Sequence, residues 1–450
     1  MNTPIADFIA RYAKSGISRL HMPGHKGAGA YKDDITEILG ADELYSPDGI
    51  ILESEQNAAR LFGSRRTLYS TEGSTQCIKA MLHIALINRR DKVRRPVCLA
   101  ARNAHKALIY AAALQDFDID WLYPEGGALS PCSCPVTPEA LQRKLSSMGE
   151  KPFCVYITSP DYLGGMQNIR GLSEVCHRCD IPLLVDNAHG AYLRFLENDL
   201  HPLTLGADMC SDSAHKTLNV LTGGAYLHIS PRAPAFAENA KDIMALYGST
   251  SPSYLILKSL DEANRYLAGD FRRELDECAK CVKSLKKTLS QRGYRLIGEE
   301  PIKLALLTDG PDAAKKLRSH AAEPEYIDKT CVVMMFTPQN KREDYTRVLA
   351  ALEGDEPSES PALAGEEISK GPAPERQAPP APGRRLTIRE AVFAQSETVP
   401  VSQALGRICA SPTVSCPPAV PICVSGEEID QAAITALKQN GISNIAVVKE

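Results

Sequence analysis

Short apolar runs alternate with helical stretches between residues 65 and 230 of the chain. Helical periodicity fills several of the intervals between these runs, as at 74–90 and 169–180. Continuous apolar runs separated by helices predict a largely parallel sheet covered on both faces, which is an α/β fold. Ligands of such sheets bind at the carboxyl ends of the strands. The predicted strands are 96–101, 117–122, 153–159, 181–186, 207–213 and 224–229.

The remaining chain divides by its pattern into further segments. Residues 1–16 predict an amphipathic helix, and after the stretch 249–267 a helical tract extends to about residue 289. Strand patterns at 302–308 and 331–337 and a helical pattern at 342–353 then predict a small α+β domain. A Pro-, Ala-, Glu- and Ser-rich stretch that follows is typical of an extended linker. The predicted divisions are 1–265, 266–353, 354–383 for the linker and 384–450 for a tail domain that ends in a strand-like run.

Composition and charge narrow the class of protein. The chain has 450 residues, 44% hydrophobic and 24% charged, with a formal net charge of -4. This balance is that of an ordinary globular protein and does not favour nucleic acid or an anionic membrane as a partner. No apolar run approaches the roughly 20 residues of a membrane-spanning helix. The amino-terminal pattern is not that of a signal peptide, so we expect a cytoplasmic protein.

Fourteen cysteines require an interpretation of their own. Two CxxC pairs, at 176–179 and 278–281, could hold zinc if they flanked one compact knuckle. They lie instead in helix-like segments about a hundred residues apart. We therefore expect most cysteines to be small buried hydrophobic residues in a reducing compartment, and no metal site.

Two of the strand ends carry residues suited to an anion and to a cation. The stretch 70-STEGSTQC-77 places Gly73, Ser74 and Thr75 at the entrance of a helix, where small hydroxyls and free backbone N–H groups bind phosphate or simply cap the helix. Asp186 ends the run 181–186, and His189 follows three residues later. A carboxylate there is either a turn cap or the partner of a cationic ring nitrogen, because burial without a partner is costly.

Two further strand ends carry a histidine and a lysine. His105 follows the run 96–101, where a lone histidine is usually a loop or cap residue. Lys216 lies in 211-SDSAHKTL-218, one helix and one return strand after Asp186. A lysine is ordinarily a solvated surface charge. A phosphate cradle, an acidic ring partner and an isolated lysine at one sheet edge are, however, what pyridoxal phosphate requires.

The ordered motifs resemble the fold-type I, pyridoxal-phosphate-dependent ornithine/lysine/arginine decarboxylases, in particular their shorter bacterial branch without a wing domain. The resemblance covers most of the chain. It implies an aspartate aminotransferase-like large domain, a small α+β domain and a carboxyl-terminal α/β tail domain. The motifs that carry it are 21-HMPGHKG-27, 34-DITEILGADELYSPDGII-51, 70-STEGST-75, 102-RNAHKA-107, 158-TSPDYLG-164, 185-VDNAHGAY-192, 212-DSAHKTL-218, 249-STSPSY-254 and 407-RICASPTVSCPPAVPICVSGEE-428.

The resemblance also implies roles for individual residues. Lys216 would carry the cofactor covalently and move protons at the substrate α-carbon, Asp186 would hold the ring nitrogen protonated, and His105 would stack on the ring. His189 would lie near the ring, whereas Asp212 receives no role. The implied phosphate ligands are Gly73, Ser74, Thr75, Ser213 and His215, with Thr250 and Ser251 reaching the site of a neighbouring subunit. The enzyme would thus be a homodimer or higher even oligomer that decarboxylates a basic amino acid.

Some features depart from the family pattern or leave alternatives open. Ala419 stands where the family commonly has glycine, and Ser425 where it commonly has proline. Asp161 could assist a cationic substrate, although a turn-forming aspartate is the simpler interpretation. Another fold-type I reaction, such as aminotransfer, would use the same lysine and aspartate, and a catalytically degenerate regulatory relative is the non-enzymatic alternative. The choice among arginine, lysine and ornithine stays open.

Overall fold

The computed structural model describes residues 1–90, 93–125, 130–353, 383, 386–412 and 419–449. Apart from Gly383, the predicted linker 354–383 lies outside the described residues. The chain forms two compact units. The first comprises Met1–Lys92, Phe153–Ser159 and Ile169–Asp276, and the second comprises Val93–Pro152, Pro160–Asn168 and Glu277–Glu450.

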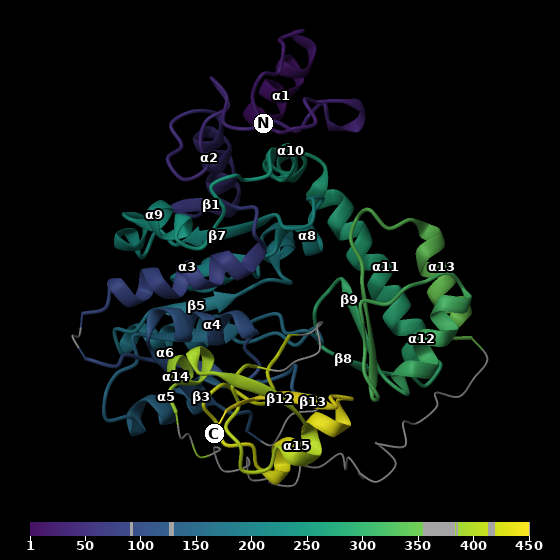
Figure 1. The fold of residues 1–450 in the computed structure, drawn as a ribbon. Coiled ribbons are helices and arrows are strands. Elements are labelled where there is room, and N and C mark those ends of the chain that lie inside the picture. Colours follow the sequence, from purple (N-terminus) through teal and green to yellow (C-terminus); the bar gives the residue numbers. More distant parts are fainter. Residues whose placement is uncertain (91–92, 126–129, 354–382, 384–385, 413–418, 450) are drawn as a thin grey trace. The chain divides into compact units, whose positions relative to one another are not determined.

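Five strands of the first unit build the part of the fold that carries most of the predicted site residues (Figure 1). Strands β4, β5 and β6 are parallel neighbours. Strand β7 runs antiparallel to β6 and to β1, so the prediction of a largely parallel sheet holds for the centre but not for this edge. Four of the strands are buried along nearly their whole length, which explains their continuous apolar sequences. Their order is β1 (Arg66–Ser70), β7 (Ala225–Ile229), β6 (Met209–Asp212), β5 (Leu183–Asp186) and β4 (Cys154–Thr158).

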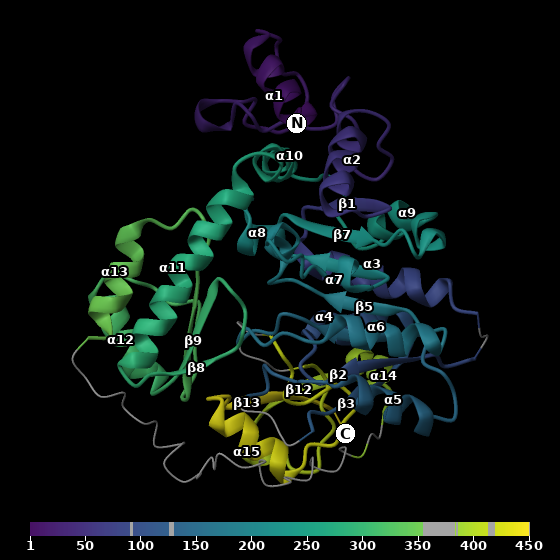
Figure 2. The same ribbon diagram turned by 180° about the vertical axis from the view of Figure 1, so that it is seen from behind.

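Helices of the first unit cover both faces of these strands (Figures 1 and 2). Helix α3 (Gly73–Ile87) packs on one face, and α6 (Ile169–Arg178) and α7 (Pro202–Leu205) pack on the other. Further helices, α1 (Pro4–Lys14), α2 (Ile50–Phe62) and α10 (Tyr254–Ala268), pack against one another. The Asp261 carboxylate of α10 accepts hydrogen bonds from the backbone N–H groups of Ile5 and Ala6, both at 3.0 Å, and so caps the start of α1. Helix α9 (Ala240–Ala245) packs against α3.

The second unit contains a parallel strand pair and a four-stranded antiparallel sheet. Strands β2 (Val97–Ala101) and β3 (Asp118–Leu122) are parallel and are connected by α4 (Lys106–Gln115); α5 (Pro138–Ser147) follows. The antiparallel sheet has the order β10 (Tyr326–Ile327), β11 (Cys331–Met335), β9 (Lys303–Leu307) and β8 (Arg295–Ile297). Helices α12 (Gly310–Ser319) and α13 (Arg342–Ala351) pack together. Helix α11 (Phe271–Gln291) begins in the first unit and ends in the second.

The tail of the second unit has its own small core. Strands β12 (Ser396–Pro400) and β13 (Asn444–Val448) form an antiparallel pair, and α15 (Gln431–Gln439) contributes to the core, whereas α14 (Ile388–Phe393) packs against α4. The buried side chains of this core are Val401, Ala404, Cys409, Cys423, Ile429, Ile434, Leu437, Ile445 and Val447.

Ala419 adopts a backbone conformation that favours glycine. Its φ is +57° and it is buried, with its carbonyl accepting a 3.0 Å hydrogen bond from the Lys106 N–H. A left-handed residue other than glycine costs about 1–2 kcal/mol, whereas glycine loses about 0.5–1 kcal/mol more backbone entropy on folding. We therefore expect Ala419→Gly to raise the unfolding free energy by about 0.5–1 kcal/mol, measured by urea unfolding.

The control for this substitution is Ala436→Gly in the middle of α15, where the backbone is helical. That change is expected to lower stability by about 1 kcal/mol. Equal losses of stability in the two variants would contradict the argument from backbone strain at position 419.

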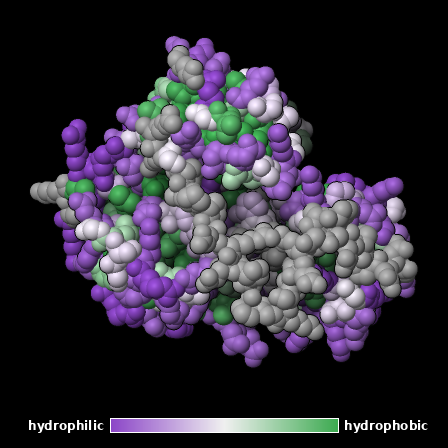
Figure 3. All heavy atoms as spheres, turned by 90° about the horizontal axis from the view of Figure 1, so that it is seen from below, coloured by the Kyte–Doolittle hydropathy of each residue, from purple (hydrophilic) through white to green (hydrophobic). Residues whose placement is uncertain are grey.

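The burial of the cysteines and the mixed character of the surface are those of an ordinary globular protein. Eleven of the thirteen described cysteines are buried, Cys179 is half-buried, Cys281 is exposed, and all thirteen are free thiols, as the sequence predicts. Figure 3 shows one face, on which hydrophobic residues lie in groups set among hydrophilic ones. No helix in the described part of the chain is long and apolar enough to cross a bilayer.

Candidate active site

The first component of the site is the turn between β1 and α3. Gly73 begins α3 with a φ of +72°, and a Cβ added there would meet no atom within 4 Å. Its N–H bonds to the Gly223 carbonyl at 2.8 Å, which fixes the turn. The side chain of Glu72, the N-cap residue of α3, makes no capping hydrogen bond. Apart from that of Gly73, the first-turn N–H groups have no partners within the helix, and together with the open space beside Gly73 they make a favourable place for an anion.

Serine hydroxyls extend this anion site from a second strand end. Ser213 follows β6 directly, and its Oγ donates a 2.8 Å hydrogen bond to Ser74 Oγ in the first turn of α3. His215 lies in the short helix α8 (Ala214–Thr217) and makes a 3.1 Å hydrogen bond from Nδ1 to the Gly224 carbonyl. The structure thus brings Ser213 to the predicted phosphate ligands of α3, and it turns one nitrogen of His215 toward the backbone.

The second component is the carboxyl group of Asp186 at the end of β5. This side chain is 3% exposed, and it accepts hydrogen bonds from the Tyr156 hydroxyl at 3.0 Å and from the Ala188 N–H at 3.2 Å. Burial raises its pKa, while the positive charge of Lys216 and the Tyr156 hydrogen bond act in the opposite direction. A cation placed against Asp186 would therefore lower the cost of its ionisation.

The third component is the amine of Lys216 in α8. Its Nζ lies 3.1 Å from Nε2 of His189, and the lysine is half-buried whereas the histidine is buried. His189 stands in the turn after β5, three residues beyond Asp186. The structure therefore brings Lys216, His189 and Asp186 together from two neighbouring strand ends, and it pairs His189 with the lysine amine.

Three predicted site residues belong to other segments of the chain. Thr250 and Ser251 are in the exposed loop between α9 and α10, and no hydrogen bond among the described residues joins them to α3. His105 belongs to the second unit, where it is the N-cap of α4 and its Nδ1 accepts a 3.1 Å hydrogen bond from the Ala107 N–H. Its predicted stacking on a ring stays a prediction, as do the roles of Thr250 and Ser251 toward a second subunit.

Asp161 is a turn-forming residue of the second unit. Its carboxylate accepts hydrogen bonds from the N–H groups of Leu163 at 2.9 Å and Gly165 at 2.8 Å, and its side chain is buried. Because the two N–H groups of its own turn occupy Oδ1, the geometry favours the turn interpretation over contact with a cationic substrate.

Sequence reasoning missed Tyr156 and the residues around Asp212. Tyr156 lies inside the apolar strand β4, where a tyrosine reads as an ordinary core residue. Asp212 is fully buried and is surrounded by His201, His228 and Asn187, which come from distant parts of the sequence. An aspartate within the lysine motif 211–218 was the available signal, but its partners could not be identified from spacing.

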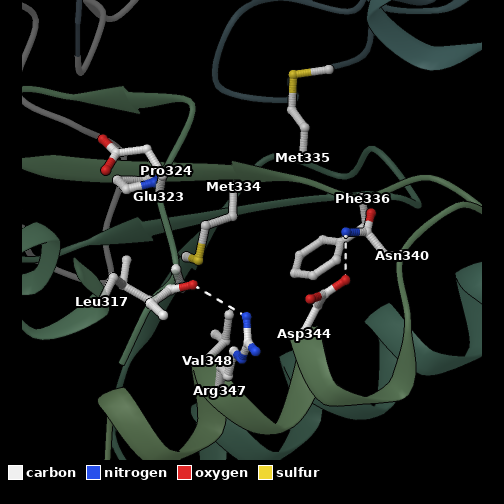
Figure 4. Close-up of a pocket in the computed structure, with 12 residues that line it drawn as sticks. Leu317, Glu323, Pro324, Met334, Met335, Phe336, Asn340, Asp344, Arg347 and Val348 are labelled. Carbon is white, nitrogen blue, oxygen red and sulfur yellow. Dashed lines mark hydrogen bonds between the residues drawn. The ribbon is translucent and has the colours of Figure 1, made fainter. Parts of the chain in front are cut away.

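A separate pocket of the second unit lacks the groups of this site (Figure 4). Its charged and polar side chains already have partners: Glu323 pairs with Arg318, Asp344 accepts from Asn340 at 3.1 Å, and Arg347 donates to the Ala321 carbonyl at 3.4 Å. No lysine lines this pocket. Its volume is about 180 Å³, and its lining residues are Leu317, Ala321, Ala322, Glu323, Pro324, Met334, Met335, Phe336, Asn340, Asp344, Arg347 and Val348.

Comparison with known protein families decides the relationship of the chain. Residues 3–306 match the major domain of the Orn/Lys/Arg decarboxylases, and residues 375–439 match their carboxyl-terminal domain. The chain belongs to the Orn/Lys/Arg decarboxylase family. The resemblance that the sequence motifs indicate is thereby confirmed.

Individual relatives of this decarboxylase extend over nearly the whole chain. Arginine decarboxylase of Bacillus subtilis is 29% identical, over 97% of this chain and 93% of its own length. Arginine decarboxylase of Halalkalibacterium halodurans is 28% identical, over 99% and 94%. The lysine decarboxylase of Francisella novicida has a similar structure, with a TM-score of 0.78 and 17% identity over 99% of this chain and 81% of that one. The predicted α/β fold of the decarboxylase family is thereby confirmed.

Proposed function

We propose that this protein is a pyridoxal-phosphate-dependent decarboxylase that releases CO₂ from a basic L-amino acid, with arginine as its preferred substrate. The observation that carries the proposal is the meeting of Lys216, His189 and Asp186 beside the uncapped start of α3. We propose arginine rather than lysine or ornithine because two relatives that match over nearly their whole length, those of Bacillus subtilis and Halalkalibacterium halodurans, are named arginine decarboxylases.

The described residues fit the chemical requirements of pyridoxal phosphate. The open space beside Gly73 and the hydroxyls of Ser74 and Ser213 suit a phosphate, with Thr75 in the same helix turn. The buried carboxyl of Asp186 suits a protonated ring nitrogen. Thr158 Oγ1, at the end of β4, is buried and has no hydrogen-bond partner among the described residues, so the strand end retains a polar atom for a ligand.

The roles of the side chains follow from these positions. When bound, pyridoxal phosphate supplies an electron sink for the electron pair left at the substrate α-carbon. Lys216 supplies the amine that carries the cofactor and returns a proton to the α-carbon after CO₂ departs. His189 holds this amine through its 3.1 Å contact and offers a second site for the proton. Asp186 keeps the ring nitrogen protonated, which stabilises the negative charge that develops when the substrate α-carbon loses CO₂.

We also infer that the active enzyme is a homodimer or higher even oligomer in the cytoplasm. The exposure of Thr250 and Ser251 supports their proposed contact with the phosphate of a neighbouring subunit. His105 of the second unit is proposed to stack on the cofactor ring. The proposed domain division is 1–265, 266–353, 354–383 and 384–450.

The test is a comparison of CO₂ release from equal concentrations of arginine, lysine and ornithine by the protein supplied with pyridoxal phosphate. Each turnover breaks the bond between the α-carbon and the carboxylate and adds one proton at the α-carbon, so one proton disappears from solution per CO₂. We expect arginine to give the fastest release, with matching proton uptake. Transfer of the amino group without CO₂ would support an aminotransferase-like enzyme instead. Failure to bind the cofactor at all would support a regulatory relative without catalysis.

A further inference from the structure

A fully buried polar cluster lies next to the proposed active site in the first unit. The Asp212 cluster, as we call it, consists of Asp212, His201, His228 and Asn187. Asp212 Oδ2 lies 3.0 Å from Nε2 of His201 and 3.3 Å from Nε2 of His228, and Asp212 Oδ1 accepts a 2.7 Å hydrogen bond from Asn187 Nδ2. All four side chains are 0% exposed. Such a cluster is costly to bury unless each group is satisfied, so its presence beside Asp186 calls for a reason.

The geometry makes Asp212 the negative centre of this cluster. Burial alone would raise its pKa, but His201 and His228 more than offset burial and hold the pKa well below its ordinary value. Burial lowers the pKa of His228, and its Nδ1 lies 2.8 Å from the Thr67 hydroxyl. Asp212 is thus an ionised carboxylate facing imidazole nitrogens and one amide.

Asn187 connects this carboxylate to the catalytic side of the sheet. It follows Asp186 in the sequence, and its N–H bonds to the Ser211 carbonyl at 2.9 Å. Its carbonyl accepts the Gly190 N–H at 2.8 Å. A Cβ on Gly190 would lie 2.0 Å from Asn187 Oδ1, so the turn closes tightly over this side chain. With its amide held by Asp212 as well, Asn187 has little freedom, and neither has the backbone of Asp186.

We propose that Asp212 is a positioning residue for Asp186, fixing it through Asn187 and strengthening its hold on a cation at the end of β5. The identity of that cation as the protonated ring nitrogen of pyridoxal phosphate rests on the proposed function. The negative charge of Asp212 also contributes to raising the pKa of Asp186, although burial contributes more. A more basic carboxyl binds a proton-bearing nitrogen more tightly.

A metal ion is the competing explanation for part of this cluster. Donor atoms of His201, Cys210 and Asp212 lie within 4.8 Å of one another. The 3.0 Å separation between His201 and Asp212 is, however, that of a hydrogen bond. The geometry therefore favours a hydrogen-bonded cluster.

The deciding experiment measures the affinity of the cofactor-free protein for pyridoxal phosphate, together with its melting temperature and its CO₂ release. Asp212→Asn is expected to weaken cofactor binding and to lower kcat, each by roughly ten- to a hundredfold, the range found when partners that orient site residues are removed. The matched control is Asp208→Asn. Asp208 also pairs with a histidine, His177, at 3.0 Å, but it precedes β6, at the end of the strand opposite Ser213. This control is expected to bind the cofactor as the unaltered protein does.

A second variant keeps the proposal falsifiable if Asp212→Asn does not fold. Asn187→Ala removes the link and leaves Asp212 with both histidines, and it is expected to weaken cofactor binding by a similar factor. Because the two residues act as one unit, the double variant should lose little more cofactor affinity than either single variant does. If the two losses of affinity multiply, as independent effects do, the proposal is overturned.

The remaining outcomes separate this inference from the proposed function. If the unaltered protein neither binds pyridoxal phosphate nor releases CO₂, the proposed function fails. If it does both and Asp212→Asn binds the cofactor equally tightly, the role of Asp212 alone fails. Equal loss of cofactor affinity in Asp212→Asn and Asp208→Asn would show a merely structural effect and would also overturn it. If one equivalent of transition metal stays bound after dialysis against a chelator, the cluster is a metal site and the hydrogen-bonded interpretation is wrong.

Discussion

Lys216→Ala is expected to lower CO₂ release by at least about 10³-fold, because the alanine side chain can neither carry the cofactor nor return a proton to the substrate. The loss should appear in kcat, while the anion site at α3 and the carboxyl of Asp186 still retain cofactor. The visible absorption of covalently attached cofactor should disappear as well. Steady-state kinetics and absorption spectra of the two proteins, each loaded with pyridoxal phosphate, check this expectation.

The matched control is another lysine with a polar partner. Lys144 forms a partly exposed ion pair with Asp120 at 2.7 Å, and such pairs contribute about 0–1 kcal/mol to stability. Lys144→Ala should therefore leave both the rate and the spectrum unchanged. A Lys216→Ala protein that keeps more than about a tenth of the CO₂ release would exclude Lys216 as the catalytic amine.

The second large effect concerns stability and the buried pair of Lys241 and Glu55. Lys241 Nζ lies 2.5 Å from Glu55 Oε1 and also donates to the Leu44 carbonyl at 2.6 Å, and both charged side chains are buried. Lys241→Met leaves the carboxylate of Glu55 without its cation. We expect a loss of about 3–5 kcal/mol in unfolding free energy, the usual cost of an unpaired buried charge. Urea unfolding followed by circular dichroism measures it.

The pH dependence of this variant has a defined sign. Burial raises the pKa of Glu55, and in the unaltered protein Lys241 opposes that shift. Without Lys241 the folded-state pKa rises further, so the folded protein binds the Glu55 proton more tightly than the unfolded chain does. The variant should therefore be most stable below the unfolded pKa and lose stability as the pH rises through the folded pKa.

The control for the charge argument is the double variant Glu55→Gln/Lys241→Met. It removes both charges and should regain part of the lost stability at neutral pH, with a smaller dependence on pH. A single Lys241→Met variant that is as stable at neutral pH as in acid would contradict the role assigned to Glu55.

Much of the fold could be predicted from the apolar pattern, since buried parallel strands are continuous apolar runs. The run 181–186 contains β5, and the run 224–229 contains β7. The edge strand β1 was not predicted, because Arg66-Thr-Leu-Tyr-Ser70 is short and half polar. Its antiparallel pairing with β7 depends on a contact across about 160 residues that local pattern does not encode.

The candidate site could be predicted from the sequence as far as its residues lie at strand ends. Lys216, Asp186 and the α3 turn could be named because strand ends of a parallel sheet meet at one edge. The hydrogen bond from Tyr156 to Asp186 could not, because tyrosine in a buried strand reads as core. The Asp212 cluster was equally hidden, since its members stand at positions 187, 201, 212 and 228 and have no common spacing.

The paired segments of the first unit are made at different times, which has a consequence for folding on the ribosome. Strand β1 and the α3 turn are made early, but their neighbour β7 follows only after β2 to β6, and the unit is complete only at Asp276. Until then the backbone N–H and C=O groups of β1 lack their partner strand. Non-local pairing of this kind slows folding and leaves strand edges open to aggregation. Nascent chains shorter than about 230 residues should therefore depend on chaperones to stay unaggregated, because β7 ends at Ile229.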